Sequence, residues 1–258
     1  MQPIGILQKR VVIVTGANTG VGKTILSALL MQLAFDAQIT LRVLKPFSAG
    51  GQEDAQLYAN LLRTGVAVSD INPWHYIQGI APMLAARQEN ARLPSLVDIT
   101  TWIRSFSSGS DLTIVEGAGG VLTPLGEGYS ILDVGMAVGG HFLVVVPNLL
   151  GAINQARLCY EVLVMNGVEK PTIVLMDSRV TDDSSETNLS AIRELCSQSQ
   201  VIRIPYVAVR SQIDKPNLIY NLLKKSLVIS ELSDRTISVL CEVAGVSRCK
   251  LKISGDTE

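Results

Sequence analysis

The feature that most constrains the fold of this chain is a glycine-rich segment, GANTGVGKT, at residues 16–24. It directly follows the apolar run Val11–Val14, and an apolar, helix-like stretch at residues 25–30 begins where it ends. A strand, a glycine-rich turn and a helix form the context of a phosphate-binding loop, because glycines let successive N–H groups point at one anion and the helix N-terminus adds its positive dipole end. We therefore predict that this segment binds a nucleoside triphosphate.

The spacing within the segment assigns roles to its residues. The pattern G-x-x-x-x-G-K-[ST] is met with Ala17 at the leading position and Gly16 one residue earlier. In such a loop Lys23 reaches the β- and γ-phosphates, and the Thr24 hydroxyl is placed to bind Mg²⁺. The residues predicted to contact the nucleotide here are Asn18, Thr19, Gly20, Val21, Gly22, Lys23 and Thr24.

The composition narrows the class of protein. Apolar residues make up 47% of the 258 residues, and the net charge is −1 without a basic run, which argues against partners such as nucleic acid or an anionic membrane. The N-terminus lacks a signal-peptide pattern, and the longest apolar stretch, residues 142–153, is broken by Pro147 and too short to span a bilayer. The four cysteines form no C-x-x-C pair, so we expect a reduced, cytoplasmic protein.

Apolar runs alternate with amphipathic stretches along most of the chain. Strands are expected at residues 11–15, 39–45, 112–116, 142–146, 172–176 and 201–204. Helices are expected at residues 23–35, 54–63, 96–106, 152–165 and 186–196. Several of the strands are continuous in Val, Ile and Leu, as parallel strands buried on both faces are. The alternation predicts an α/β fold of the P-loop NTPase type: a doubly wound, mainly parallel sheet with helices on both faces and ligands at the carboxyl ends of the strands.

We expect residues 1–258 to form a single P-loop α/β domain. Residues 212–258 differ from the rest because they read as helical, with Ser233 and Asp234 as the expected N-cap before the apolar residues 237–240. We interpret them as a C-terminal helical subregion packed on the same domain, to which the sequence assigns no role.

Three charged side chains stand where expected strands end or a helix begins. Lys45 ends the second strand, Asp54 opens a helix, and Glu116 ends the third strand before a glycine-rich turn. A glutamate at such a point can hold Mg²⁺ directly or through water. Each also has a simpler explanation. Lys45 could be an ordinary surface lysine, and Asp54 could be a helix cap. The glycines after Glu116 could serve a turn alone, although such a turn does not require the glutamate.

Two later segments are weaker signals. The residues Gly151, Ala152, Ile153 and Asn154 read as a helix N-terminus whose free N–H groups suit a substrate carboxylate. Pro205 and Tyr206 follow the last strand and could flank a nucleobase. On spacing alone, packing is the better explanation of each segment.

Taken together, these segments resemble the dethiobiotin synthetase family, whose members are ATP-dependent P-loop enzymes. The family's T-G-T-D-T-[EG]-V-G-K-T loop is matched at residues 15–24, and its V-E-G-A-G-G segment is unchanged at residues 115–120. Further family-like segments lie at residues 45–50, 54–55, 72–73, 151–154 and 204–206. The resemblance extends over residues 11–207 in consistent order, which is more specific than any one motif.

Two positions depart from the family pattern. Ala49 stands where Ser or Thr is usual, with Ser48 beside it. Asp177 is the nearest candidate for the asparagine that the family places near the nucleobase. Because an aspartate accepts a hydrogen bond from a base amino group but cannot donate one, the nucleotide preference is left open.

The resemblance implies a reaction. In such enzymes CO₂ adds to one amine of 7,8-diaminononanoate, the carbamate oxygen attacks the γ-phosphorus of ATP, and the second amine closes a ureido ring with loss of phosphate. It implies that Lys23 and Lys45 are the catalytic clamp on carbamate and γ-phosphate, and that Thr24, Asp54 and Glu116 arrange Mg²⁺.

The resemblance also implies where the small molecules bind. Substrate contacts are expected from Ser48, Gly119, Gly151, Ala152, Ile153 and Asn154. Nucleobase contacts are expected from Asp177, Pro205 and Tyr206. A homodimer with active sites at its interface is implied by the family alone.

Other functions stay open on the sequence. A switch ATPase of the ParA/MinD type would carry an additional lysine early in the loop, where this chain has Asn18, and would lack V-E-G-A-G-G. An amide ligase acting on a tetrapyrrole would need a glutamine-hydrolysing domain, for which there is no room. A degenerate paralogue that binds nucleotide without the ligase reaction is kept open by Ala49 and Asp177.

Overall fold

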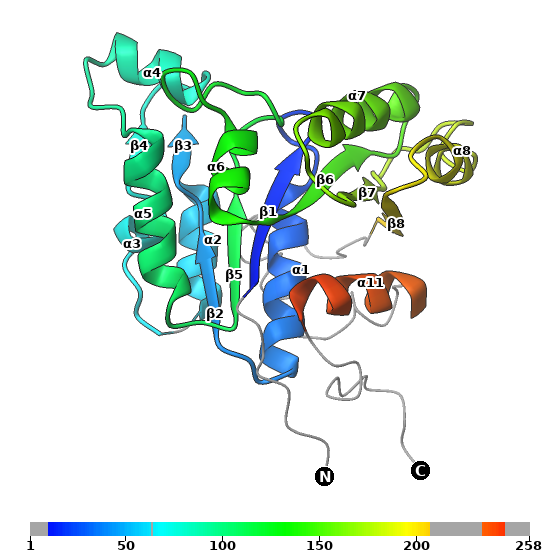
Figure 1. The fold of residues 1–258 in the computed structure, drawn as a ribbon, viewed down its shortest axis with the longest axis horizontal. Helices are drawn as coiled ribbons and strands as arrows, with labels where there is room; N and C mark the ends of the chain where they lie inside the picture. Colours follow the sequence, from blue (N-terminus) through cyan, green and yellow to red (C-terminus); the bar gives the residue numbers. More distant parts are fainter. Residues whose placement is uncertain (1–9, 63, 207–233, 246–258) are drawn as a thin grey trace.

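Six parallel strands form the central sheet in the computed structural model, which describes residues 10–62, 64–206 and 234–245 (Figure 1). Their order across the sheet is β2-β5-β1-β6-β7-β8, and every neighbouring pair is parallel. The strands are β1 (Arg10–Gly16), β2 (Leu41–Leu44), β5 (Leu112–Glu116), β6 (His141–Pro147), β7 (Thr172–Met176) and β8 (Gln200–Ile204). The predicted doubly wound, mainly parallel sheet is confirmed.

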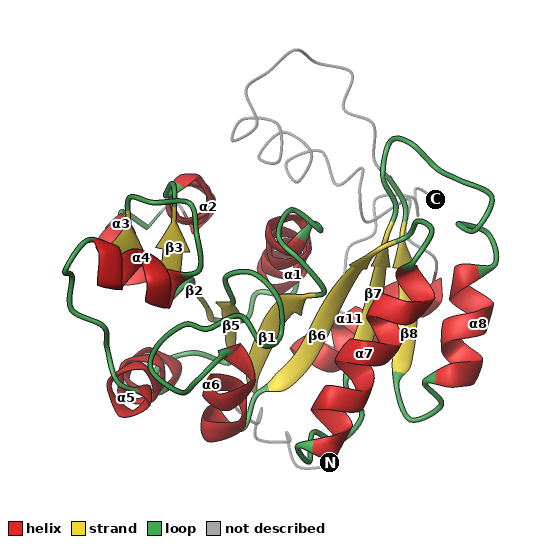
Figure 2. Cartoon of the chain, turned by 90° about the horizontal axis from the view of Figure 1, so that it is seen from above, coloured by secondary structure: helices red, strands yellow, loops and turns green. Residues whose placement is uncertain are grey.

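Helices cover both faces of this sheet (Figure 2). One face packs against α1 (Lys23–Asp36), α2 (Glu53–Leu62) and α11 (Asp234–Ala244). The other packs against α5 (Leu96–Ser107), α6 (Ile131–Val138), α7 (Ala152–Met165) and α8 (Asn188–Leu195). Neither face of the inner strands is left to solvent, which explains why their sequences are continuously apolar.

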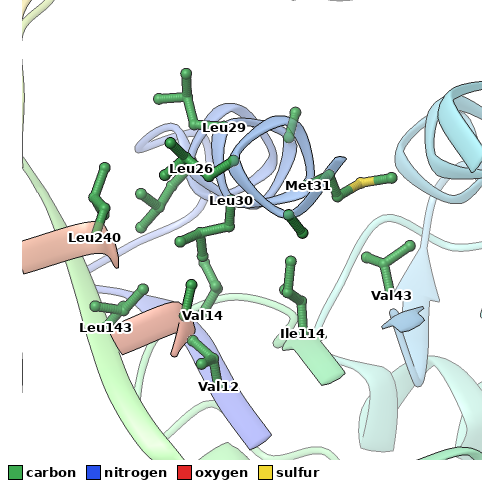
Figure 3. Close-up of a cluster of buried hydrophobic side chains, with 14 of the residues drawn as sticks. Val12, Val14, Leu26, Leu29, Leu30, Met31, Val43, Ile114, Leu143 and Leu240 are labelled. Carbon is green, nitrogen blue, oxygen red and sulfur yellow. The ribbon is translucent and has the colours of Figure 1, made fainter. Parts of the chain in front are cut away.

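The hydrophobic core is divided in two by the sheet. Val12 and Val14 of β1 contribute to the cluster under α1 and α11, whereas Ile13 between them contributes to the cluster on the opposite face. In Figure 3 the side chain of Leu240 from α11 lies in the first cluster with Leu143 of β6. Burying one such side chain stabilises the fold by about 1.5–3 kcal/mol.

A small second sheet widens the molecule next to β2. It pairs β3 (Phe47–Ala49) with β4 (Trp74–Tyr76) in parallel, and α3 (Val68–Ile71) and α4 (Pro82–Gln88) accompany it. A row of aromatic rings ties it to α5: Phe47, Trp74, Trp102 and Phe106 follow one another with centroid separations of 5.5, 5.5 and 5.4 Å. This row fixes β3, which leads away from the end of β2.

Several of these elements are absent from the sequence-based prediction. The elements β3, β4 and α3 span only three or four residues each, too few for a periodic pattern to register. The helix α6 contains Gly135, a poor helix former. A Cβ at that glycine would lie 2.3 Å from Cζ of Phe142, so close packing of α6 on the sheet requires it.

Some predicted boundaries are wrong by one or two residues. The strand expected at residues 39–45 is shorter because the Thr40 amide and hydroxyl bind the carboxylate of Asp111, and the Lys45 amide donates to Ile71 outside the sheet. The helix expected from residue 186 begins at Asn188, because the residues before it form a turn in which the Thr187 amide donates to the Ser184 carbonyl.

The C-terminal part of the prediction is only partly covered. The helix α11 lies where a helix was expected after Asp234, and it packs against β8 and α1. Residues 212–233 and 246–258 lie outside the described residues, so the assignment of all 258 residues to one domain stays a prediction. Among the helices of the described ranges, none is long and apolar enough to cross a membrane.

The packing of α11 generates a stability prediction. Leu240 is fully buried against the sheet, so Leu240→Ala should leave a cavity and lower the free energy of unfolding by about 2–5 kcal/mol. Ser238 is exposed on the same helix, and Ser238→Ala should change it by less than about 0.5 kcal/mol. Urea unfolding followed by circular dichroism measures both. Equal stability of the two variants would mean that α11 does not pack on the sheet as described.

Candidate active site

The glycine-rich loop lies at the carboxyl end of β1, between the ends of β5 and β6. From β1 the chain continues to β2 on one side of it, whereas from β5 it crosses to β6 on the other side, so the direction of the connections reverses at β1. Such a switch point is where open α/β sheets bind ligands. A cavity of about 820 Å³ opens there, within the upper range of small-molecule sites. It extends from the ends of β2 and β5 to the ends of β7 and β8.

The start of α1 is built to receive an anion. Gly22 caps the helix with φ 101°, a conformation that favours glycine, and no acidic residue stands in the first turn. A Cβ at Gly22 would also lie 3.0 Å from Cγ of Met176, so the loop and the end of β7 approach closely. The first N–H groups of α1 therefore stay available for phosphate oxygens. The Lys23 ammonium is folded back onto the loop, where it donates to the carbonyl of Asn18 at 2.9 Å.

Two lysines and two carboxylates share the deep end of the cavity. Nζ of Lys45 lies 2.7 Å from Oε1 of Glu116 and 2.8 Å from Oδ2 of Asp54. Lys23 approaches from the loop, and the charges of Glu116, Lys45 and Asp54 all act on it. The two positive and two negative charges balance, which is the condition under which charges tolerate burial.

The surroundings shift the pKa values of these groups in different directions. Burial lowers the pKa of Lys23 to about 8, and the attraction of Glu116 offsets this only in part. Burial also disfavours the charge of Lys45, but Glu116 and Asp54 outweigh it and raise the pKa of that lysine. Burial acts against the ionised form of Asp54 too, yet the charge of Lys45 and its hydrogen bond keep the Asp54 pKa below its usual value. Lys45 is thus a fixed cation, whereas the pKa of Lys23 is lowered to about 8.

Glu116 is held by four donors. Its Oε1 accepts from Lys45 and, at 3.2 Å, from the Thr24 hydroxyl. Its Oε2 accepts from the hydroxyls of Ser27, at 2.7 Å, and Tyr58. Burial and the charge of Glu116 hold the pKa of Tyr58 well above its usual value, so the phenol stays protonated and donates.

Ser27 and Tyr58 are absent from the sequence-based site. Their one signal is helical spacing: Ser27 follows Lys23 by four residues, and Tyr58 follows Asp54 by four, which places each pair on one helix face.

The turn after β2 is fixed by an asparagine. Asn72 accepts from the Ser48 hydroxyl at 2.6 Å and donates to the carbonyl of Lys45 at 2.8 Å. Opposite this turn Gly119 has φ +73° and packs against Thr123, whose hydroxyl accepts from the Gly120 amide at 2.7 Å. Ser48 and Gly119 both line the cavity, as do Ala49 and Thr123.

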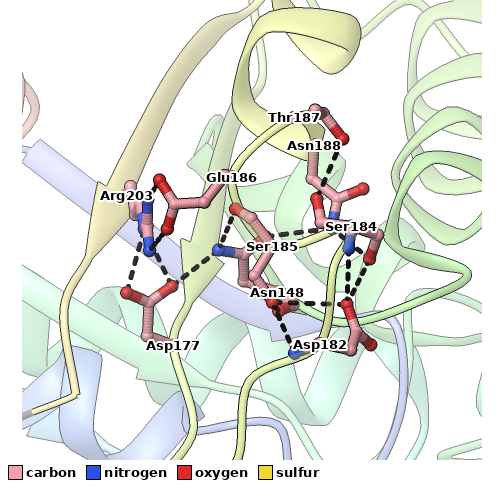
Figure 4. Close-up of polar contacts among 9 residues, drawn as sticks. All are labelled: Asn148, Asp177, Asp182, Ser184, Ser185, Glu186, Thr187, Asn188 and Arg203. Atoms are coloured by element: carbon pink, nitrogen blue, oxygen red, sulfur yellow. Dashed lines mark hydrogen bonds and ion pairs between the residues drawn. The ribbon is translucent and has the colours of Figure 1, made fainter.

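The far end of the cavity is apolar with one acid. Met176, Ile204, Pro205 and Tyr206 line it together with Asp177. The Asp177 carboxylate binds Arg203, at 2.9 Å to Oδ2, and Oδ1 accepts from Asn148 at 2.7 Å (Figure 4). Most of its accepting capacity is therefore used within the protein.

The same network fixes the loop between β6 and α7. Asn148 binds Ser185 and Asn188 (Figure 4). The Leu150 amide donates to Asp182 at 2.7 Å. These contacts hold residues 147–151 in front of α7, whose N-cap is Gly151 with φ 95°.

The structure brings most of the predicted site residues to one cavity. Those that line it are Thr19, Gly20, Gly22, Lys23, Thr24, Lys45, Ser48, Asp54, Glu116, Gly119, Asp177, Pro205 and Tyr206. Asn18 offers its carbonyl to Lys23, and Val21 is buried in the core. The residues Gly151, Ala152, Ile153 and Asn154 do not line the cavity of this chain, and Gly151 and Asn154 are exposed.

The fold and the phosphate-binding loop define a P-loop nucleotide-binding protein. Residues 10–216 match the family described as AAA domain. Among solved structures, pNOB8 ParA bound to nonspecific DNA superposes with a TM-score of 0.56 at 12% identity, over 92% of this chain and 97% of that one. The cell division ATPase MinD of Pyrococcus furiosus gives a TM-score of 0.50 at 13% identity, over 84% of this chain and 98% of that one. At such identities the likeness concerns the fold alone.

Curated relatives narrow the class. A protein of Akkermansia muciniphila named ATP-dependent dethiobiotin synthetase BioD is 31% identical over 70% of this chain and 85% of its own length. One of the same name from Bacillus velezensis is 29% identical over 86% of this chain and 96% of its own. The chain belongs to the ATP-dependent dethiobiotin synthetase family, as the order of its motifs predicts.

The lowered pKa of Lys23 generates a prediction. The free protein holds much of Lys23 neutral above pH 8, whereas bound phosphates favour the ammonium and raise its pKa. ATP binding at pH 8.5 should therefore take up protons, and affinity should fall as pH rises above 8, by at most about tenfold per unit. Calorimetry in buffers of different ionisation enthalpy measures the uptake.

A matched variant provides the control for this measurement. Lys23→Arg keeps a charge that does not titrate in this range, so its proton uptake should vanish. Pronounced uptake in that variant, or none in the unaltered protein, would assign the titration to another group.

Proposed function

We propose that the protein is an ATP-dependent cyclo-ligase of biotin biosynthesis, which converts 7,8-diaminononanoate and CO₂ to dethiobiotin. The observation that carries this proposal is a second lysine in the cavity, Lys45, held 2.7 Å from Glu116 at the end of β2. Binding of nucleotide phosphates alone needs only the loop and Lys23. A second buried cation suits a second anion that must approach the γ-phosphate, and the carbamate of the diamine is such an anion.

The residues around Lys45 fit a magnesium ion. Thr24, Asp54 and Glu116 supply oxygen atoms only, the ligand type that Mg²⁺ prefers. Within the described ranges no three His, Cys, Asp or Glu side chains gather to hold a metal by themselves. That agrees with Mg²⁺, which usually takes one or two protein carboxylates and completes its shell with phosphates and water. When bound, the ion would neutralise charge on the β- and γ-phosphates.

The proposed chemistry needs no covalent enzyme intermediate. CO₂ and one amine give the carbamate and a proton, and a carbamate oxygen then attacks the γ-phosphorus while ADP leaves. The second amine attacks the carbamate carbon, which expels phosphate and releases the proton of that amine, and the ureido ring closes. Lys23 and Lys45 hold the two anions together against their repulsion, so the protein contributes positioning and charge stabilisation.

The two ends of the cavity are proposed to hold different parts of the reactants. The nucleobase would lie against Pro205 and Tyr206, with Asp177 accepting from an amino group at the position that Arg203 and Asn148 leave free. The diamine would lie between the turn at Ser48 and Gly119.

The N-terminus of α7 is proposed to bind the substrate carboxylate. The residues 151–154 lie outside this chain's cavity, so they would have to reach the cavity of a second subunit. Gly151 and Asn154 are exposed at the start of α7, which supports that arrangement. A homodimer with interfacial sites is therefore part of the proposal.

The proposal is tested by product formation. The purified protein should incorporate labelled bicarbonate into a ureido product from diaminononanoate, and ATP turnover should require diamine and CO₂ together. The control omits each reactant in turn. ATP turnover stimulated by DNA, lipid or a protein, with the diamine inert, would instead favour a switch ATPase of the ParA/MinD type. Nucleotide binding without any turnover would favour a paralogue that has lost the reaction.

Lys45 gives the second test. Lys45→Met should lower ring closure by two to three decades, equivalent to about 2.7–4 kcal/mol of transition-state stabilisation. Affinity for ATP should stay within about tenfold, ~1.4 kcal/mol, because the loop and Lys23 hold the phosphates. Product assays and calorimetry give the two quantities.

Stability has to be controlled in this experiment. Removing the partner of buried Glu116 costs roughly 3–5 kcal/mol of folding free energy, so the variant is assayed well below its unfolding transition. The matched control is Lys170→Gln, which alters an exposed lysine. Near-normal product formation by folded Lys45→Met would refute the proposal that Lys45 holds the carbamate against the γ-phosphate.

A further inference from the structure

The buried phenol of Tyr58 is a polar group at the site for which the proposed chemistry has no use. Its side chain is fully buried in α2 and does not line the cavity. Phe would fill the same core space, so packing does not account for the hydroxyl. A buried hydroxyl is costly unless it is bonded, and this one donates to a charged acceptor, Oε2 of Glu116.

The donors around Glu116 are sorted between its two oxygens. Oε2 receives the two hydroxyls that come from helix interiors, Ser27 of α1 and Tyr58 of α2. Oε1 receives the two groups that line the cavity, Thr24 and Lys45. Two donors on Oε2 oppose rotation of the carboxylate group, so the oxygen presented to the cavity is always Oε1.

The phenol also links Glu116 to Asp54. Tyr58 and Asp54 lie four residues apart on α2, and therefore on the same face of that helix. While Tyr58 binds Glu116, Asp54 contacts Lys45, and Lys45 contacts Glu116. The two carboxylates of the site thus come from separate elements, α2 and β5, which the buried Tyr58 hydrogen bond joins directly and Lys45 bridges.

We infer that Tyr58, assisted by Ser27, is a positioning residue that fixes Glu116 so that only one carboxylate oxygen serves the magnesium nucleotide. The inference rests on the proposed use of Mg-ATP, but not on the identity of the second substrate. Partners that orient a ligating side chain typically contribute 10–100-fold to metal affinity. Tyr58 touches neither nucleotide nor metal, and acts through Glu116.

The test measures metal affinity rather than turnover. Mn²⁺ is titrated into the protein saturated with a non-hydrolysable ATP analogue, and free Mn²⁺ is followed by electron paramagnetic resonance. Tyr58→Phe should raise the dissociation constant for Mn²⁺ about tenfold or more. Binding of the analogue in EDTA should stay unchanged, because the loop supplies it.

Two further variants control for structure. Tyr129 is likewise buried, and its hydroxyl donates to the neutral carbonyl of Pro94 at 2.7 Å. Tyr129→Phe therefore removes an equivalent hydrogen bond away from the site and should leave Mn²⁺ affinity within twofold. Ser27→Ala removes the second donor to Oε2 and should weaken Mn²⁺ binding in the same direction as Tyr58→Phe. If Tyr58→Phe does not fold, Ser27→Ala decides the question.

The outcomes separate this inference from the proposed function. Mn²⁺ affinity within twofold of the unaltered protein in folded Tyr58→Phe, or in Ser27→Ala where the former does not fold, overturns the positioning role. An analogue complex that binds no Mn²⁺ at all overturns it too. Weakened Mn²⁺ binding in a protein that forms no ureido product supports the positioning role and overturns the proposed reaction.

Discussion

The buried carboxylate of Glu116 is the group on which the rest of the site depends. An ionised carboxylate away from water is costly unless each oxygen finds donors, and here four donors arrive from α1, α2 and the end of β2. The hydrogen-bond donors to this one carboxylate come together only if the phosphate-binding loop, the turn after β2 and α2 meet at the end of β5. The need to compensate a buried charge therefore organises the cavity as much as apolar packing does, and it explains why these elements meet at the end of β5.

Charge balance lets the same region hold four ionisable side chains close together. Two cations and two carboxylates cancel, and because Lys45 and Glu116 are buried, the contact between them is stronger than it would be in water. Phosphates or metal ions that bind here would replace existing contacts of these four side chains, because each of the four already has a partner. Lys45, fixed between two acids, keeps its charge, whereas Lys23 is partly desolvated and responds to what binds. The two lysines are thus electrostatically distinct although both face one cavity.

Sequence reasoning reached the sheet and thirteen of the residues that line the cavity, because both follow from local patterns. Continuous apolar runs indicate parallel strands, and polar residues after such runs lie at one edge of the sheet. It did not predict β3 and β4, which are held by aromatic contacts from α5. It did not predict α6 either, because Gly135 is required there by close packing against Phe142 of β6. Tyr58 and Ser27 were missed for the same reason: their partner, Glu116, is distant in the chain. Interactions between segments that are distant in the chain produce no periodic pattern in the sequence.

The aromatic row beside β3 has a spectroscopic consequence. The chain contains two tryptophans, and both belong to this row, with ring centroids 5.5 Å apart. All tryptophan emission therefore originates from the region of β4 and α5. The two indole rings are close enough for energy transfer between them. Phe47, which stacks on Trp74, also lines the cavity. Tryptophan fluorescence of the unmodified protein is consequently a local optical probe of the turn after β2, because neither of the chain's two tryptophans lies near β7 or β8.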